Sequence, residues 1–180
     1  MMAHQQIIDF WFVETDPKQW WRQDGEFDRR IAERFGEVLK QAMQCELFAW
    51  RSQPLGRLAE IIVLDQFSRN IHRGAAQAFA ADPLALALAQ EAVAAHAAAG
   101  LEPRQRAFLY MPYMHSESRL IHPLAVELFS EKGLESYLDF ELRHKAIIDR
   151  FGRYPHRNAM LGRHSSQEES DFLKTPGSSF

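Results

Sequence analysis

Residues 24–43 read DGEFDRRIAERFGEVLKQAM, and the apolar side chains of this stretch decide the fold class. Phe27, Ile31 and Phe35 follow one another at intervals of four residues, a spacing that places them on one face of an α-helix. Asp24 stands just before this pattern and is typical of a residue that caps a helix N-terminus. The stretch therefore predicts a long amphipathic helix with one buried face.

Helix start and stop signals continue along the rest of the chain. Proline near the start of a segment predicts helices that begin close to Pro54, Asp82-Pro83, Pro103 and Pro123. Gly100 is expected to close the alanine-rich helix that Asp82-Pro83 opens. Further helices are expected over 134–151 and after Ser166, which has the capping-box spacing to Glu169. Because Pro112 has no N–H, we expect the helix that begins at Pro103 to end or kink near Met111.

The whole chain is expected to form one all-α domain over residues 1–180. No alternating strand pattern of useful length is present, and no linker separates two parts. Short connections favour stacked antiparallel hairpins, about 7–9 helices in all and no sheet. A fixed repeat of about 34 residues, which would mark tetratricopeptide units, is not visible.

Composition excludes several classes of protein. The net charge of −3 and the isoelectric point near 6.2 argue against a general nucleic-acid coat. Cys45 is the only cysteine, so no intramolecular disulfide can form, and a cytoplasmic setting is expected. No apolar run approaches the roughly 20 residues of a membrane span, and no signal peptide is read at the N-terminus.

Residues 143–164 form a basic segment. Six Lys and Arg residues stand against one acid, Asp149, which makes the formal charge +5 with three histidines counted as neutral. Arginine forks suit phosphate or carboxylate, so this segment predicts an anion-binding loop. The residues expected to bind the ligand are Arg153, His156, Arg157, Asn158 and Arg163. The alternative is structural, with these arginines capping helices and pairing with internal acids.

A second candidate stretch runs over 64–74. Asp65 and Arg69 are four residues apart, with the acid first, which is the favourable order for an ion pair on one helix face. With Asn70 and Arg73 they are predicted to contribute to the ligand site. The alternative is an ion pair that only terminates the helix and its turn at Gly74.

The third candidate is the stretch that follows Pro112. His115 and Glu117 are close in sequence and are candidate acid and base groups, because histidine titrates near neutrality and a carboxylate can orient it. His156 is the other catalytic candidate. No metal-binding motif is present, so neither a metal nor a cofactor is expected. The alternative for His115 and Glu117 is a turn held by their side chains.

Four strings resemble one bacterial family, the domain of unknown function 924. They are LDQFSRNI at 64–71, FLYMPYMHSE at 108–117, FGRYPHRN at 151–158 and PGSSF at 176–180. The openings IIDFWF at 7–12 and KQWW at 18–21 are also similar to it. The resemblance implies an all-α, tetratricopeptide-like fold. It implies no activity and no catalytic residues.

These observations leave three main hypotheses for the function. The first is a helical scaffold that binds an anionic small molecule or peptide carboxylate in an Arg- and His-lined pocket. The second is an enzyme of hydrolase or transferase type that uses His115 or His156 as acid and base. The third is a protein-interaction module. A membrane partner is not expected, nucleic acid is the least favoured partner, and the oligomeric state is left open.

Overall fold

The computed structural model describes residues 2–180. Over these residues the chain is helical and contains no strand, which confirms the predicted all-α class. The α-helices are α1 (His4–Asp9), α2 (Gly25–Met43), α3 (Pro54–Ile62), α4 (Ser68–Ile71), α5 (Asp82–Ala94), α6 (Pro103–Met114), α7 (His122–Phe129), α8 (Glu135–Phe151) and α9 (Gln167–Phe172). Within this part of the chain, no helix is both long and apolar enough to cross a membrane.

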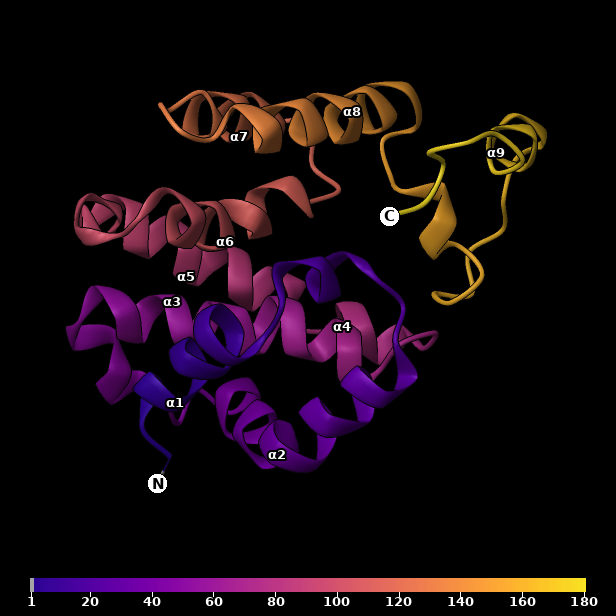
Figure 1. Cartoon of the computed structure of the whole chain (residues 1–180). Coiled ribbons are helices and arrows are strands. Elements are labelled where there is room, and N and C mark those ends of the chain that lie inside the picture. Colours follow the sequence, from indigo (N-terminus) through magenta and orange to yellow (C-terminus); the bar gives the residue numbers. More distant parts are fainter. Residues whose placement is uncertain (1) are drawn as a thin grey trace.

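The helices lie in layers that follow the order of the chain (Figure 1). α7 and α8 pack together at the top of the view, α5 and α6 form the next layer, and α1 to α4 lie below them. α6 packs on α7, and α3 packs on both α5 and α6. α9 lies to one side, with the last residues of the chain. Stacked helical pairs account for this arrangement, while the finer tetratricopeptide-like geometry stays a prediction.

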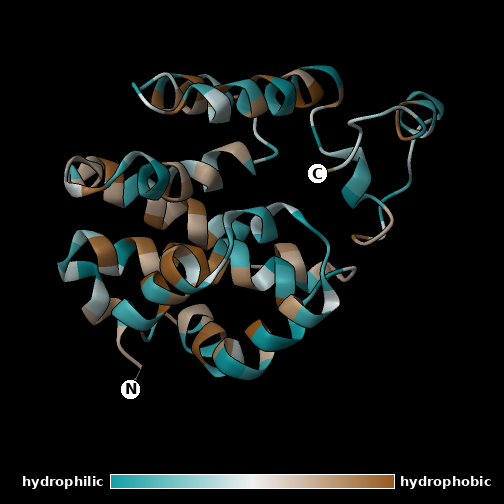
Figure 2. Cartoon of the chain, viewed as in Figure 1, coloured by the Kyte–Doolittle hydropathy of each residue, from teal (hydrophilic) through white to brown (hydrophobic). Residues whose placement is uncertain are grey.

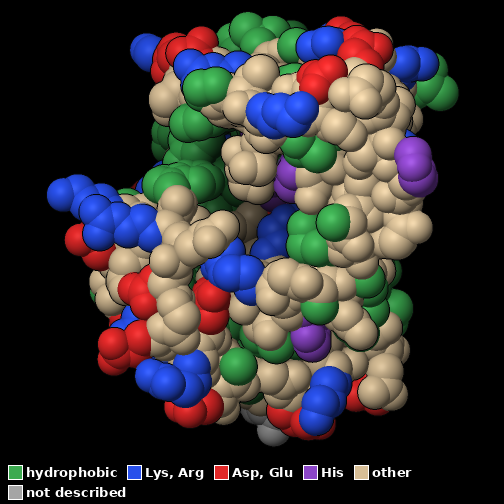
Figure 3. Space-filling model, turned by 90° about the vertical axis from the view of Figure 1, so that its right-hand side faces the viewer, with side chains coloured by type: hydrophobic (Ala, Val, Ile, Leu, Met, Phe, Trp, Pro, Cys, Tyr) green, Lys and Arg blue, Asp and Glu red, His purple; other side chains and the backbone are tan. Residues whose placement is uncertain are grey.

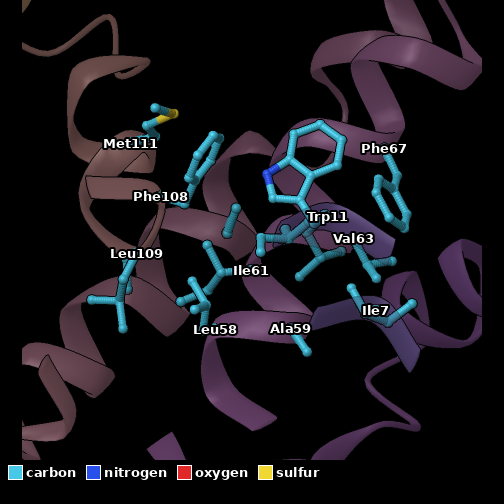
Figure 4. Packing of buried hydrophobic residues seen from close by; sticks show 14 of the residues in the cluster. Ile7, Trp11, Leu58, Ala59, Ile61, Val63, Phe67, Phe108, Leu109 and Met111 are labelled. Carbon is cyan, nitrogen blue, oxygen red and sulfur yellow. The ribbon is translucent and has the colours of Figure 1, made fainter. Parts of the chain in front are cut away.

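Trp11 is central to the hydrophobic core. Its side chain is 1% exposed, and the rings of Phe67 and Phe108 meet it edge to face, each at 5.6 Å between centroids. Figure 4 shows these rings packed with Leu58 and Ile61 of α3. In Figure 2 the apolar residues gather where the layers face one another. The core therefore joins the π-helical turn Phe10–Glu14, which follows α1, to α3 and α6.

Two predicted helix caps are confirmed. Asp24 accepts hydrogen bonds from the backbone N–H groups of Glu26 and Phe27, at 3.0 and 3.1 Å. At the start of α9, Ser166 and Glu169 form the reciprocal capping box that their spacing predicts. These caps satisfy N–H groups that have no partner inside the helix.

One predicted helix end is wrong, and of the two outcomes predicted near Met111, an end or a kink, the end is not observed. α6 does not end near Met111 but continues through Pro112 to Met114. Residues 107–114 are all buried, and this packing holds the helix despite the hydrogen bond that proline cannot donate. α5 ends at Ala94, well before Gly100, because His96 takes the left-handed conformation (φ 54°) that commonly terminates helices.

A π-helical turn, Val63–Phe67, joins α3 directly to α4. Such turns contain one extra residue and are frequent at functional sites. All five residues of this turn are buried, among them the polar Asp65 and Gln66. The turn therefore carries a carboxylate into the interior, where it needs a partner.

Candidate functional site

Asp65 and His115 form a hydrogen-bonded pair between the π-helical turn and the end of α6. His115 Nδ1 lies 2.7 Å from Asp65 Oδ1, and the side chain of Asp65 is 1% exposed. The Gln66 amide donates to the other oxygen of Asp65 at 2.7 Å. An ionised carboxylate only accepts, so Nδ1 of His115 carries the proton and Nε2 keeps its lone pair. We call Asp65 and His115 the dyad.

Two arginines and a second aspartate surround the dyad. Arg69 lies 3.3 Å from Asp65 and donates to both oxygens of Asp82, at 2.8 and 3.0 Å. Arg157 donates to Asp82 at 3.2 Å and to the backbone carbonyl of His115 at 3.0 Å. Asp82 at the start of α5 therefore joins Arg69 to Arg157. With a neutral His115, the formal charges of the two arginines and two aspartates cancel.

Burial and charge set the protonation of the dyad. Burial opposes the ionisation of Asp65, but His115 and Arg69 outweigh it and hold the pKa of Asp65 well below its usual range. Burial, reinforced by Arg69, lowers the pKa of His115 even though Asp65 acts in the opposite direction. At neutral pH the pair is therefore a carboxylate beside a neutral imidazole.

The site is partly open to solvent. The side chains of Arg69 and His115 are 20% and 13% exposed. Figure 3 views the face on which α9 lies and shows a hollow there with basic and histidine side chains at its floor. Among the described residues, no hydrogen-bond partner is found for His115 Nε2. The dyad thus has a spare acceptor at a site that solvent reaches.

Arg157 is more deeply buried than Arg69. Its guanidinium lies over the rings of Phe79 and Tyr154, at 4.5 and 4.7 Å from their centroids. Its residue is 4% exposed, and its buried Nε has no hydrogen-bond partner in the described part of the chain. Burial, and then the nearby Arg69, lowers the pKa of Arg157. An acceptor oxygen from a ligand would satisfy this group.

Asn70 and Arg73 lie apart from the dyad. Both donate to Asp28 of α2, Asn70 at 2.8 Å and Arg73 at 2.6 and 2.9 Å. Asn70 of α4 and Arg73 in the turn that follows α4 therefore connect this part of the chain to α2.

The other predicted residues of the basic segment form a separate network. Glu117 accepts from Arg163 at 2.7 and 2.9 Å and from the Tyr154 backbone N–H at 2.6 Å. Asn158 accepts from Arg163, also at 2.9 Å. Arg153 pairs with Glu169 of α9 at 2.7 and 2.8 Å. These contacts fix the conformation of the segment after α8. They also occupy guanidinium donors that the sequence predicts to bind a ligand.

His156 lies next to Tyr154, with 5.8 Å between ring centroids. Its Nδ1 is buried and has no hydrogen-bond partner within residues 2–180. Burial, and then Arg157, lowers the pKa of His156 to about 4. It is therefore neutral at pH 7, with no carboxylate in hydrogen-bond contact to orient it.

Sequence reasoning missed one contributor to the site, Asp82, and one buried structural pair, His122 and Glu141. Asp82 was read only as the start of a helix, and nothing local reveals that it contacts Arg69 and Arg157. His122 and Glu141 form a fully buried pair at 2.7 Å, with His122 also bonded to the Ser116 carbonyl at 2.8 Å. A histidine with both nitrogens satisfied has no free group for chemistry, so this pair is structural.

No metal centre is assigned. Within the described residues, no cluster of three or more His, Cys, Asp or Glu side chains has the geometry to hold an ion.

Comparison with known proteins identifies the family. A model of the family described as "Bacterial protein of unknown function (DUF924)" matches residues 7–177. This chain belongs to the DUF924 family. A solved structure, the protein of unknown function ATU0120 from Agrobacterium tumefaciens, superposes with a TM-score of 0.90 at 35% identity. The match covers 95% of this chain and 96% of that chain. No curated protein matches the chain.

Membership in DUF924 agrees with the resemblance of the sequence strings and with the helical fold. The family description names no reaction and no ligand, so the function of this chain has to be inferred from its own geometry.

Proposed function

We propose that this DUF924 protein is an enzyme of hydrolase or transferase type that acts on a small anionic or carboxyl-bearing substrate. His115 is the general base, Asp65 orients it, and Arg69 and Arg157 bind the substrate. The observation that carries this proposal is the 2.7 Å contact between His115 Nδ1 and a buried carboxylate, with Nε2 left unpaired.

The dyad has the properties that a general base requires. The carboxylate holds one tautomer of the imidazole, so Nε2 can accept a proton from water or a hydroxyl group. The positive charge that forms on His115 is stabilised by Asp65 at short range. Because the pKa of His115 is lowered, the ring is already in its basic form at neutral pH.

The arginines support an acceptor-rich substrate. Arg157 has an unpaired buried Nε, and the partial exposure of Arg69 makes one guanidinium accessible from solvent. The two aspartates already neutralise both arginines. The site therefore favours a ligand group with directed acceptor oxygens over a ligand group with a high net charge. Phosphoryl and carboxyl groups both fit this description.

Turnover of chromogenic esters tests the catalytic half of the proposal. With p-nitrophenyl phosphate and p-nitrophenyl acetate as probes, His115→Gln should lower kcat by about 100-fold or more, the usual contribution of a general base. His164→Gln is the matched control, since His164 is exposed, and it should keep wild-type activity. Hydrolysis by His115→Gln at the wild-type rate, or no turnover of either probe by wild type, would contradict the proposal.

Thermal-shift measurements test the anion-binding part of the proposal. Inorganic phosphate and acetate should raise the Tm of the wild-type protein, because a ligand of the folded state stabilises it. Arg157→Gln should abolish the shift, whereas Arg73→Gln, which also loses an aspartate partner, should keep it. Equal shifts in both variants would show that the anions bind elsewhere.

A further inference from the structure

Three rings form a cup beside the dyad. They belong to His144 of α8 and to Tyr154 and His156 of the segment that follows α8. Tyr154 lies 5.8 Å from each histidine between ring centroids. Tyr154 is fully buried and His144 is 6% exposed. We call these three residues the aromatic cup.

The ring of Phe180 lies in the aromatic cup. Its centroid is 3.7 Å from that of His144, 4.5 Å from His156 and 5.0 Å from Tyr154. Phe180 nevertheless remains 53% exposed, so one side of the ring faces solvent. A phenyl ring thus occupies the cup through three ring contacts and little other burial, which makes it displaceable.

The backbone after α9 places Phe180 there. Gly177 turns the chain in the left-handed conformation (φ 77°), which glycine adopts without strain. The next residue, Ser178, is 6% exposed and donates its hydroxyl to the Leu173 carbonyl at 3.1 Å. The turn and this bond tether the segment, so the ring can leave the cup while the segment stays close to it.

The walls of the cup are uncharged at neutral pH. Burial lowers the pKa of His144 to about 3 and that of His156 to about 4, and it raises the pKa of Tyr154. His144 Nδ1 donates to the Phe140 carbonyl at 2.7 Å, and the Tyr154 hydroxyl donates to the Met114 carbonyl at 2.5 Å. Flat, uncharged rings suit the face or edge of another aromatic ring.

The cup adjoins the dyad. The rings of His144 and His115 are 6.4 Å apart between centroids. Tyr154 also contacts the guanidinium of Arg157, which binds the backbone of His115. One substrate of moderate size can therefore place a ring in the cup and a reactive group at His115.

We propose that the aromatic cup is the aryl-binding subsite of this site, that the substrate carries a benzyl or similar planar ring, and that Phe180 fills the cup when no substrate is bound. The placement of the substrate's reactive group at His115 rests on the proposed function. The aromatic cup and its occupation by Phe180 do not depend on that function. A tethered ring competes at an effective concentration in the millimolar range, so an aryl ligand must displace it.

Imidazole NMR spectra and a matched pair of ligands test the inference. Phe180→Ala should move the His144 and His156 signals, because the ring current of Phe180 is lost. N-acetyl-phenylalaninamide should bind Phe180→Ala at least about tenfold more tightly than wild type, since the tethered competitor is gone. N-acetyl-leucinamide, the aliphatic control, should bind neither protein. Phe48→Ala removes another exposed ring, remote in sequence, and should behave like wild type.

Unmoved imidazole signals in Phe180→Ala would overturn the inference, as would equal affinity of the phenyl probe for both proteins. Because Phe180 is half exposed, its removal leaves the core intact. The Asp65→Asn/Phe180→Ala protein separates the two proposals. If it binds the phenyl probe while His115→Gln retains full turnover, the cup is supported and the proposed function fails.

Discussion

At the scale of single residues, Asp65 is the residue on which the candidate site depends most. It is a buried carboxylate with three polar partners, His115, Arg69 and Gln66. Burial alone would make its ionised form costly, and these partners compensate. The residue therefore connects stability to the protonation of His115.

Asp65→Asn should destabilise the protein by about 3 kcal/mol, because it leaves Arg69 without one buried partner. It should also lower the pKa of His115 further, since the negative charge of Asp65 raises that pKa. Urea denaturation at pH 7 and NMR titration of His115 measure the two effects. Asp171→Asn, which breaks an exposed pair, should change the stability by less than about 1 kcal/mol. A His115 pKa that is unchanged in Asp65→Asn would show that the two groups are not coupled.

At the scale of elements, α3 is held very close to the preceding 3₁₀ turn, Phe48–Ser52. A Cβ atom on Gly56 would lie 2.0 Å from the Trp50 carbonyl oxygen, so only glycine permits this approach. Gly36 of α2 is different, because nothing lies within 4 Å of the Cβ position. The two helical glycines therefore have opposite roles.

Gly56→Ala should lower the free energy of unfolding by about 2 kcal/mol or more, since the backbone of Trp50 must move. Gly36→Ala should raise it by about 0.5–1 kcal/mol, because alanine is the better helix former and meets no obstacle. Chemical denaturation of the two variants measures both changes in the free energy of unfolding. A Gly56→Ala protein as stable as wild type would mean that α3 does not approach the turn this closely.

At the scale of the whole molecule, the segment after α8 is attached by two kinds of contact. The ion pair Glu117–Arg163 attaches it to the residues that follow α6, and the pair Arg153–Glu169 joins it to α9. The neutral imidazoles of His144 and His156 lie where it meets α8. A buried imidazole that resists protonation makes stability depend on pH.

Stability should fall as the pH drops from 7 to 5. The folded-state pKa values of His144 and His156, about 3 and about 4, lie below that of an unfolded chain, so the unfolded state binds protons first. Their stabilisation is complete above a pH of about 6.5 and decreases by about 2 kcal/mol per histidine at pH 5. Glu169, with a pKa of about 2, contributes to the pH dependence of stability only at lower pH.

Denaturation at pH 5, 6 and 7 should show a shallower pH dependence of stability for His156→Gln than for wild type. His164→Gln should match wild type, and equal slopes in all three proteins would contradict the assignment.

Much of the fold follows from the sequence alone, because helix formation depends on neighbours three or four residues away. The apolar face of α2, the Asp24 cap and the capping box of α9 are all local patterns, and the structure confirms them. The observed extents of α5 and α6 show the limit of such patterns. Packing along α6 outweighs the local effect of Pro112.

The partners within the site were decided by the tertiary structure. The sequence offered Asp65, His115 and Arg157 as chemically suitable groups, but each had several candidate partners. Fifty residues separate Asp65 from His115, and 75 separate Asp82 from Arg157. The stacking of the helical layers brings such residues within hydrogen-bond distance. Pairs this far apart in the sequence have no characteristic spacing, so the sequence alone does not reveal them. The same stacking places Arg73 on Asp28 and Glu117 on Arg163, away from the dyad.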